Sequence, residues 1–384
     1  MNFDRTEEQE LIAASIARFV ERDYTFEIRQ RIVASESGCS DEVWRKMAEL
    51  GLLGIGIPEA YGGLGGGTLN AMSLMEAIGD ALVVEPWLAT VGLGAQLLAR
   101  GGNDEQRERY LPAVVDGSLR LAFAHDQPGA RQATSDESVV GRPAPDGYVI
   151  SGRRSMVAHA QSAHLLIVPV RSEDAFSAPA ATLVIVARDA PGVTLQALRM
   201  LDGTRSAHVT FDRVRVGADG VIGAPGGASP LIAQVMDLGT ALICAEAVGA
   251  IQSANTATLE YLRSRRQFGV PIGSFQALQH RMVDMVIEAE QAKSMASLAC
   301  SSVDTEHDAT ARSRTVSAAK VRIGEACRQV SQESIQLHGG MGMSDELKVS
   351  HTFRRLTAIA QQFGDVDHHL NRFAALSSAA AGVN

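Results

Sequence analysis

The sequence has few cysteines and no cluster of positive charge. Its four cysteines, Cys39, Cys244, Cys300 and Cys327, are widely spaced and form no Cys-x-x-Cys pair. This spacing argues against a metal site or a disulfide framework and favours a reducing, cytoplasmic compartment. The formal net charge is −9, and no run of Lys and Arg could follow a phosphate backbone, so we expect no binding to nucleic acid.

The sequence also lacks an uninterrupted hydrophobic run of membrane-spanning length. Its most apolar long stretch, residues 230–251, contains Asp237 and Glu246. Two acidic residues are costly inside a lipid bilayer, so this stretch predicts a buried helix and no membrane association.

Three patterns follow one another along the 384 residues. Residues 1–118 show apolar side chains at helical spacing, whereas residues 119–228 carry short β-branched runs separated by turn residues. The runs that predict strands are residues 148–150, 165–168, 183–186 and 209–211. Ser229 followed by Pro230 is typical of a helix start, and residues 229–384 then return to a helical pattern. The sequence predicts an α+β protein with a helical, an antiparallel β and a second helical domain.

A glycine-rich segment at residues 57–67 is a weak candidate for a phosphate-binding loop. A nucleotide loop follows a buried strand, and no convincing strand precedes this segment. We therefore predict a loop between helices.

Two short motifs in the last domain carry the strongest signal. The first combines Arg265, Gln267, Phe268 and Gly269 with Phe275, Gln276 and Asp284 further on. The second is the run Gln336-Leu-His-Gly339-Gly340-Met-Gly342. Together, and in this order, they resemble the signatures of the flavin-dependent acyl-CoA dehydrogenases.

The resemblance covers nearly the whole chain and implies the architecture of that family. In it an N-terminal helical domain is followed by an antiparallel β-barrel and a C-terminal four-helix bundle. It implies FAD as cofactor, an acyl-CoA thioester as substrate in fatty acid metabolism, and an electron-transferring flavoprotein as electron acceptor. The residues that it assigns to FAD are Arg265, Gln267, Phe268, Gln276, Gln336, Gly339, Gly340, Asp126, Val157, Ala158, Val366 and His368.

The reaction of the family needs a carboxylate to remove the α-proton of the thioester while the flavin accepts the β-hydrogen as hydride. At the usual position of this glutamate the chain has Gly364, and at the alternative position on an earlier helix it has Gly239. Three carboxylates remain as candidates, in the order Asp365, Asp237 and Glu246, and the absence of any base is a further outcome. Asp237 also matches an aspartate that shapes the acyl-CoA pocket, where Thr240 replaces its usual companion arginine.

Three interpretations stay open. In the first, the chain is a homotetrameric dehydrogenase, a dimer of dimers, with a relocated base. In the second, it is the partner subunit in a heterotetramer with a larger acyl-CoA dehydrogenase. Three segments together, residues 363–370, 244–249 and 268–280, are similar to the small-subunit type of pimeloyl-CoA dehydrogenase. This resemblance favours the second interpretation and a dicarboxylyl or other bulky acyl group. In the third, the chain is a flavin oxidase or monooxygenase on the same fold.

Overall fold

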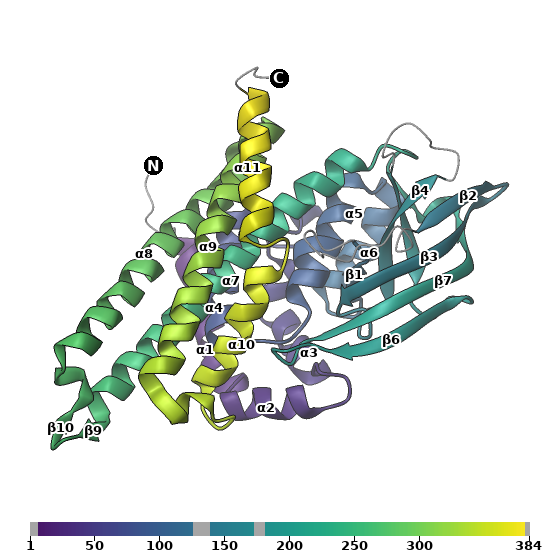
Figure 1. Cartoon of the computed structure of the whole chain (residues 1–384). Helices are drawn as coiled ribbons and strands as arrows, with labels where there is room; N and C mark the ends of the chain where they lie inside the picture. The colour runs from purple at the N-terminus through teal and green to yellow at the C-terminus, as the bar shows by residue number, and fades with distance from the viewer. Residues whose placement is uncertain (1–6, 126–138, 173–180, 381–384) are drawn as a thin grey trace. The chain divides into compact units, whose positions relative to one another are not determined.

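The computed structural model describes residues 7–125, 139–172 and 181–380, shown in Figure 1. The chain groups into two compact units. The helical unit comprises Met1–Arg29, Thr68–Val83 and Thr240–Asn384, and the sheet unit comprises Gln30–Gly67 and Val84–Gly239. Helices α2 (Phe26–Ala34) and α7 (Ser229–Ser264) run from one unit into the other. The three-part division at residues 118 and 228 stays a prediction.

The helical unit is built from α7 and long, alanine-rich helices. Its other helices are α1 (Glu7–Asp23), α4 (Thr68–Ala81), α8 (Gln276–Thr305), α9 (Ala309–His338), α10 (Lys348–Gln361) and α11 (Val366–Ala380). Between α7 and α8 lies a hairpin of β9 (Arg266–Gln267) and β10 (Val270–Pro271), followed by the 3-10 turn η6 (Ile272–Ser274). A second 3-10 turn, η7 (Gly339–Met343), follows α9. Helix α7 starts at Ser229, as the sequence predicts.

Helix α7 is also long and apolar enough to span a membrane by composition alone. Its apolar window is 72% buried inside the protein. A buried core helix passes the same test, so the helix gives only weak evidence for a membrane span.

Two glycines let α4 and α7 approach each other backbone to backbone. A Cβ atom on Gly79 would lie 1.9 Å from the carbonyl oxygen of Glu246, and one on Gly249 would lie 1.7 Å from that of Glu76. Neither distance is compatible with a side chain, so this crossing requires glycine at both positions.

The start of α4 is capped by a residue that is distant in sequence. Asp304, near the end of α8, accepts hydrogen bonds from the Thr68 amide at 2.8 Å and its hydroxyl at 2.7 Å, and from the Leu69 amide at 3.2 Å. A carboxylate here satisfies unpaired helix amides and opposes the positive end of the helix dipole.

The sheet unit combines short helices with one mixed sheet. Its helices are α3 (Asp41–Glu49), η1 (Leu52–Gly54), η2 (Glu59–Tyr61), the π-helix η3 (Leu88–Ala95), α5 (Gln96–Gly101), α6 (Asp104–Val115) and η5 (Ala218–Gly220). Its strands are β1 (Leu121–Phe123), β2 (Val140–Ala144), β3 (Gly147–Ala158), β4 (Leu165–Ser172), β5 (Ala181–Ala187), β6 (Val193–Arg199), β7 (Arg205–Gly217) and β8 (Val221–Ile222).

The strand order is β6-β7-β3-β2-β4-β5-β8, and β1 also pairs with β4. The four predicted strand segments lie in β3, β4, β5 and β7 and are confirmed. Pairing is antiparallel except that β1 and β2 both run parallel to β4, so the sheet is mixed rather than purely antiparallel. Inward-facing residues of the central strands, among them Ile150, Leu166, Val184, Val209 and Phe211, form its hydrophobic core.

The glycine-rich segment 57–67 is a loop folded upon its own backbone. The amides of Gly56 and Leu64 donate to the carbonyls of Gly65 and Gly54, and that of Gly65 donates to Ile57, each at 2.8 Å. These amides are already satisfied, so they are not presented to a phosphate. The prediction of a loop between helices is confirmed.

Candidate functional site

The first motif forms an exposed hairpin that begins at the end of α7. Gln267 pairs with Val270, which leaves Phe268 and Gly269 as the two turn residues, with φ of 52° and 83°. Positive φ at both turn positions is typical of a tight hairpin. The Phe268 side chain is 91% exposed and lies edge-on to Phe275, with ring centroids 6.2 Å apart. Val270 is exposed beside the two rings, and an exposed apolar patch of this kind is typical of a surface that meets a ligand or another chain.

Arg265 and Gln276 flank this hairpin. Arg265 follows the last residue of α7 and Gln276 begins α8, and both side chains are exposed. An exposed arginine keeps its planar donor fork available for a phosphate or a carboxylate.

The second motif ends α9 and enters η7. Gly339 has φ of 61°, and a Cβ atom on Gly339 or Gly340 would meet nothing within 4 Å. A flat ligand could therefore approach the main chain closely here. Gln336 is exposed one turn earlier.

The structure brings the two motifs together. Tyr261, whose carbonyl accepts the Arg265 amide at 2.8 Å, stacks on His338 with ring centroids 4.5 Å apart. Burial lowers the pKa of His338, and its Nδ1 lies 2.8 Å from the Ser334 carbonyl. This stacked pair holds the end of α7 against the end of α9.

The segment that the resemblance gives to flavin in the sheet unit contains two strained residues. Met156 and His159 have φ of 54° and 56°, and the register of β3 against β7 shifts between Arg154 and Val157. Such bulges turn a side chain out of the regular pleat and are common beside active sites. Met156 is exposed, Val157 is buried and Ala158 ends the strand. The remaining predicted residue, Asp126, lies outside the described residues.

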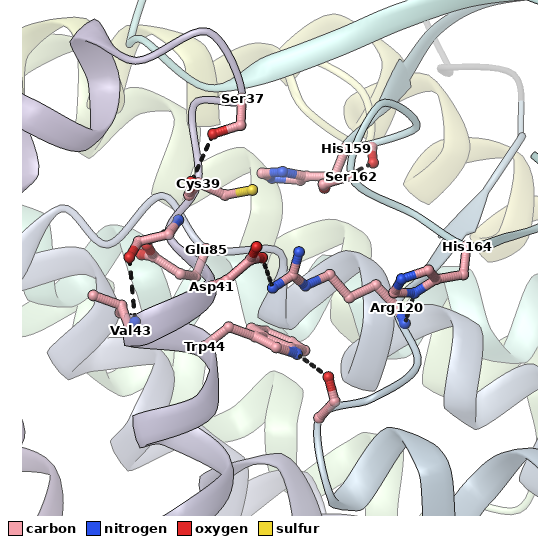
Figure 2. A network of polar contacts seen from close by, with 12 residues as sticks. Ser37, Cys39, Asp41, Val43, Trp44, Glu85, Arg120, His159, Ser162 and His164 are labelled. Carbon is pink, nitrogen blue, oxygen red and sulfur yellow. Dashed lines mark hydrogen bonds and ion pairs between the residues drawn. The ribbon is translucent and has the colours of Figure 1, made fainter.

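A polar network supports this segment from the side of α3 (Figure 2). Arg120 donates to Asp41 at 2.6 Å and lies over the Trp44 ring at 5.4 Å. The sulfur of Cys39 points towards His159 and Ser162. Burial raises the pKa of the Cys39 thiol, so it stays protonated and has little nucleophilic character. We assign this network a structural role.

In the helical unit, the position that the resemblance gives to the catalytic glutamate lies in a tight turn between α10 and α11. Phe363 and Gly364 have φ of 60° and 106°. The fully buried Lys320 donates to the carbonyls of Gly364, Ile359 and Ala360 at 3.0, 3.1 and 3.2 Å. Burial lowers the pKa of Lys320. The three carbonyls solvate the ammonium group in place of water.

The acidic residue next to this turn already accepts a hydrogen bond from the main chain. Asp365 accepts the amide of His368 at 2.9 Å, so its side chain caps the start of α11, where Val366 and His368 also lie. An N-cap side chain satisfies a helix amide that has no partner within the helix.

The other two candidate carboxylates are buried. Glu246 is 2% exposed and pairs with Arg355 of α10 at 2.5 Å, which gives it the partner that a buried charge requires. Asp237 and Thr240 lie one turn apart on α7, and both are buried.

The pKa of His369 predicts a loss of stability in acid. Its Nε2 donates to the Phe363 carbonyl at 3.0 Å, and burial lowers its pKa from 6.5 to about 3. Between these values the unfolded chain binds a proton that the folded chain does not, so stability falls as the pH decreases. We expect this residue alone to cost about 2 kcal/mol on going from pH 8 to pH 5.

Urea unfolding at several pH values checks this expectation, with His369→Gln as the control. Glutamine can still donate to Phe363 but does not titrate. Its stability should therefore depend less on pH by about the same amount, and an equal slope in both proteins would contradict the assignment.

Comparison with known proteins decides the family. The acyl-CoA dehydrogenase N-terminal domain matches residues 6–118, and its C-terminal domain matches residues 229–375. The probable acyl-CoA dehydrogenase YngJ of Bacillus subtilis is 30% identical over 360 residues, covering 92% of this chain and 93% of that protein. This chain belongs to the acyl-CoA dehydrogenase family. Its members are FAD-dependent oxidoreductases that act on CH–CH groups.

Two solved structures are similar over almost the whole chain. The ChsE4-ChsE5 complex of Mycobacterium tuberculosis has a TM-score of 0.89 and 26% identity, and covers 99% of both chains. A variant of the Tcur3481-Tcur3483 steroid ACAD has a TM-score of 0.86 and 27% identity, and covers 98% of this chain and 99% of that one. The fold class expected for an acyl-CoA dehydrogenase is confirmed.

The described residues of the helical unit fit an FAD of this family. The site offers an exposed guanidinium at Arg265, exposed amide side chains, an exposed aromatic ring and two glycines with open space beside them. These groups match a pyrophosphate, an adenine and a ribose in their chemistry.

Three features of the site were not predicted. The first is Lys320, a charged residue on the otherwise apolar face of its helix. The second is the ion pair of Glu246 with Arg355, which are far apart in the sequence. The third is the stack of Tyr261 on His338, which depends on how α7 and α9 pack. Only Lys320 leaves a signal in the sequence, because it lies at helical spacing from Val316 and Ile323, on the apolar face of α9.

Proposed function

We propose that this chain is the partner subunit of a heteromeric acyl-CoA dehydrogenase. It contributes FAD-binding surface, while a companion chain contributes the carboxylate that removes the α-proton. The observation that carries the proposal is the turn at Gly364: glycine stands where the resemblance places the base, and the adjacent Asp365 caps a helix. The two similar structures are named as pairs of components, which supports a two-chain assembly.

We assign the FAD contacts to the residues that the sequence singles out. Arg265 pairs with the pyrophosphate, and Gln267, Gln276 and Gln336 offer amides to the adenine and ribose. Gly339 and Gly340 allow close approach, and Phe268 packs against the cofactor. Val157, Ala158, Asp126, Val366 and His368 complete the proposed set. When bound, FAD supplies the acceptor for the β-hydride.

The proposed substrate is a bulky acyl-CoA thioester. One similar structure is named a steroid ACAD, and a two-chain assembly is consistent with a large acyl group. Asp237 and Thr240 are the proposed contacts to the acyl-CoA. We propose an electron-transferring flavoprotein as the electron acceptor.

Arg265→Ala is expected to weaken FAD binding by about 10- to 100-fold, because one charge-assisted contact to the pyrophosphate is lost. Flavin content and the dissociation constant, measured by fluorescence, check this. Arg263→Ala is the matched control, since Arg263 is also exposed near the end of α7. Equal FAD affinity in both variants would remove Arg265 from the site.

Purification of a tagged chain from its native cells tests the assembly. We expect a second acyl-CoA dehydrogenase in the complex, with glutamate at the position matching Gly364 or Gly239. A homotetramer that turns over acyl-CoA by itself would contradict the proposal.

The second candidate is a homotetrameric dehydrogenase that uses Asp365 as its base. Asp365 is next to the usual base position, which favours it over the other carboxylates. Asp365→Asn separates the two functions of this side chain, because asparagine still caps a helix but does not accept the α-proton. On our proposal the variant complex keeps its activity, whereas a loss of about 10²-fold or more would assign the base to Asp365.

A further inference from the structure

The turn at Gly364 is closed to any side chain. A Cβ atom added to Gly364 would lie 2.5 Å from Cδ2 of His368, 3.0 Å from its Cγ and 3.1 Å from Nε2 of His369. All three distances are shorter than ordinary van der Waals contact. The space that the first atoms of a glutamate would need is filled by two imidazole rings.

The backbone cannot easily move to make room. The buried Lys320 donates a hydrogen bond of 3.0 Å to the Gly364 carbonyl. His369 donates one of 3.0 Å to the preceding carbonyl, that of Phe363. The His368 amide is bound to Asp365, which fixes the start of α11. The φ of 106° at Gly364 adds strain for any residue with a Cβ atom.

Of the two histidines, His368 can be replaced with less damage to the fold. His369 is 1% exposed and bonded to the turn, whereas His368 is partly exposed. Rotation of the His368 ring about its Cβ–Cγ bond leaves Cγ in place, so it does not relieve the 3.0 Å contact with that atom.

We propose that Gly364 and His368 form a matched pair that closes the position of the family's base, so that no carboxylate fits there while His368 keeps its ring. This inference rests on the proposed function as a partner subunit. It identifies His368 as a second residue that keeps this turn without a base. A single Gly364→Glu change would then disturb the turn instead of restoring a dehydrogenase.

Thermal unfolding of four proteins tests the pair: the wild type, Gly364→Ala, His368→Ala and the double variant. We expect Gly364→Ala to lower Tm by about 2–5 °C through crowding and backbone strain. In the His368→Ala background the same change should lower Tm by less than half as much. Equal losses in both backgrounds would overturn the proposal.

Gly62→Ala separates strain from crowding. Gly62 also has a positive φ, of 82°, but a Cβ atom there meets nothing within 4 Å. Gly62→Ala should therefore lower Tm by the same amount in the wild-type and the His368→Ala backgrounds. If Gly364→Ala gives no folded protein, recovery of folded protein in the double variant supports the pair, and failure to recover contradicts it.

Different results would contradict the Gly364–His368 pair and the proposed function. Flavin bleaching by the wild-type chain alone would contradict the partner-subunit function and leave the coupling of Gly364 to His368 untouched. Additive Tm losses would remove the pair and leave the partner-subunit function standing.

Discussion

Arg355→Met is expected to lower the free energy of unfolding by about 3–5 kcal/mol, because it leaves the carboxylate of Glu246 buried without its partner. The two side chains are 2.5 Å apart and both are buried. Urea unfolding of the purified variant measures the loss. The pair joins α10 to α7, so we also expect the variant to unfold in a less cooperative transition.

The double variant Glu246→Leu/Arg355→Met is the control. Replacing both members of a buried pair by apolar residues of similar size is often neutral, so most of the lost stability should return. A double variant as unstable as the single one would show that Arg355 acts through other contacts.

Gly249→Ala is expected to lower the free energy of unfolding by about 3 kcal/mol. The new methyl group would lie 1.7 Å from the carbonyl oxygen of Glu76, and neither helix backbone can yield without separating α4 from α7. Chemical unfolding gives the size of the loss.

Gly324→Ala is the matched control, because it also places alanine within a long helix. There the added carbon meets Cγ2 of Val366 at 2.7 Å, so a side chain and not a backbone must shift, and alanine favours the helix by about 1 kcal/mol. We expect a clearly smaller loss of stability than at Gly249. If both variants are equally stable, α4 and α7 are not in backbone contact.

Much of the fold is predictable because its signals are local. The β-branched runs near Ile150, Ile167 and Ile185 lie in strands, and the serine-proline pair at Ser229 starts α7. Strand β6 is not among the predicted segments because it alternates polar and apolar residues and has no run of consecutive large apolar residues such as those of β4 and β5. The parallel pairing of β1 with β4 was also missed, because strand order depends on contacts between distant segments.

In the candidate site, too, local features are predictable from the sequence and contacts made by tertiary packing are not. The hairpin at Phe268 and the open backbone at Gly340 follow from short motifs. The sequence also predicts that Gly364 takes the place of the usual base, but only the structure shows that Lys320 and the His368 ring surround it. His368 lies only four residues after Gly364, but the closure of the turn by its ring and by Lys320 of α9 has no local signature, since it depends on tertiary packing.

The central claim is that this chain has no base of its own. Its most direct test is an anaerobic titration of the chain, purified alone and supplied with FAD, against butyryl-CoA, octanoyl-CoA and a steroid-derived CoA thioester. The visible flavin band reports the outcome. We predict that the band is not bleached by any thioester with the chain alone, and that bleaching requires the companion subunit. Rapid bleaching by the chain alone would contradict this account, because it would demonstrate a working base within these 384 residues.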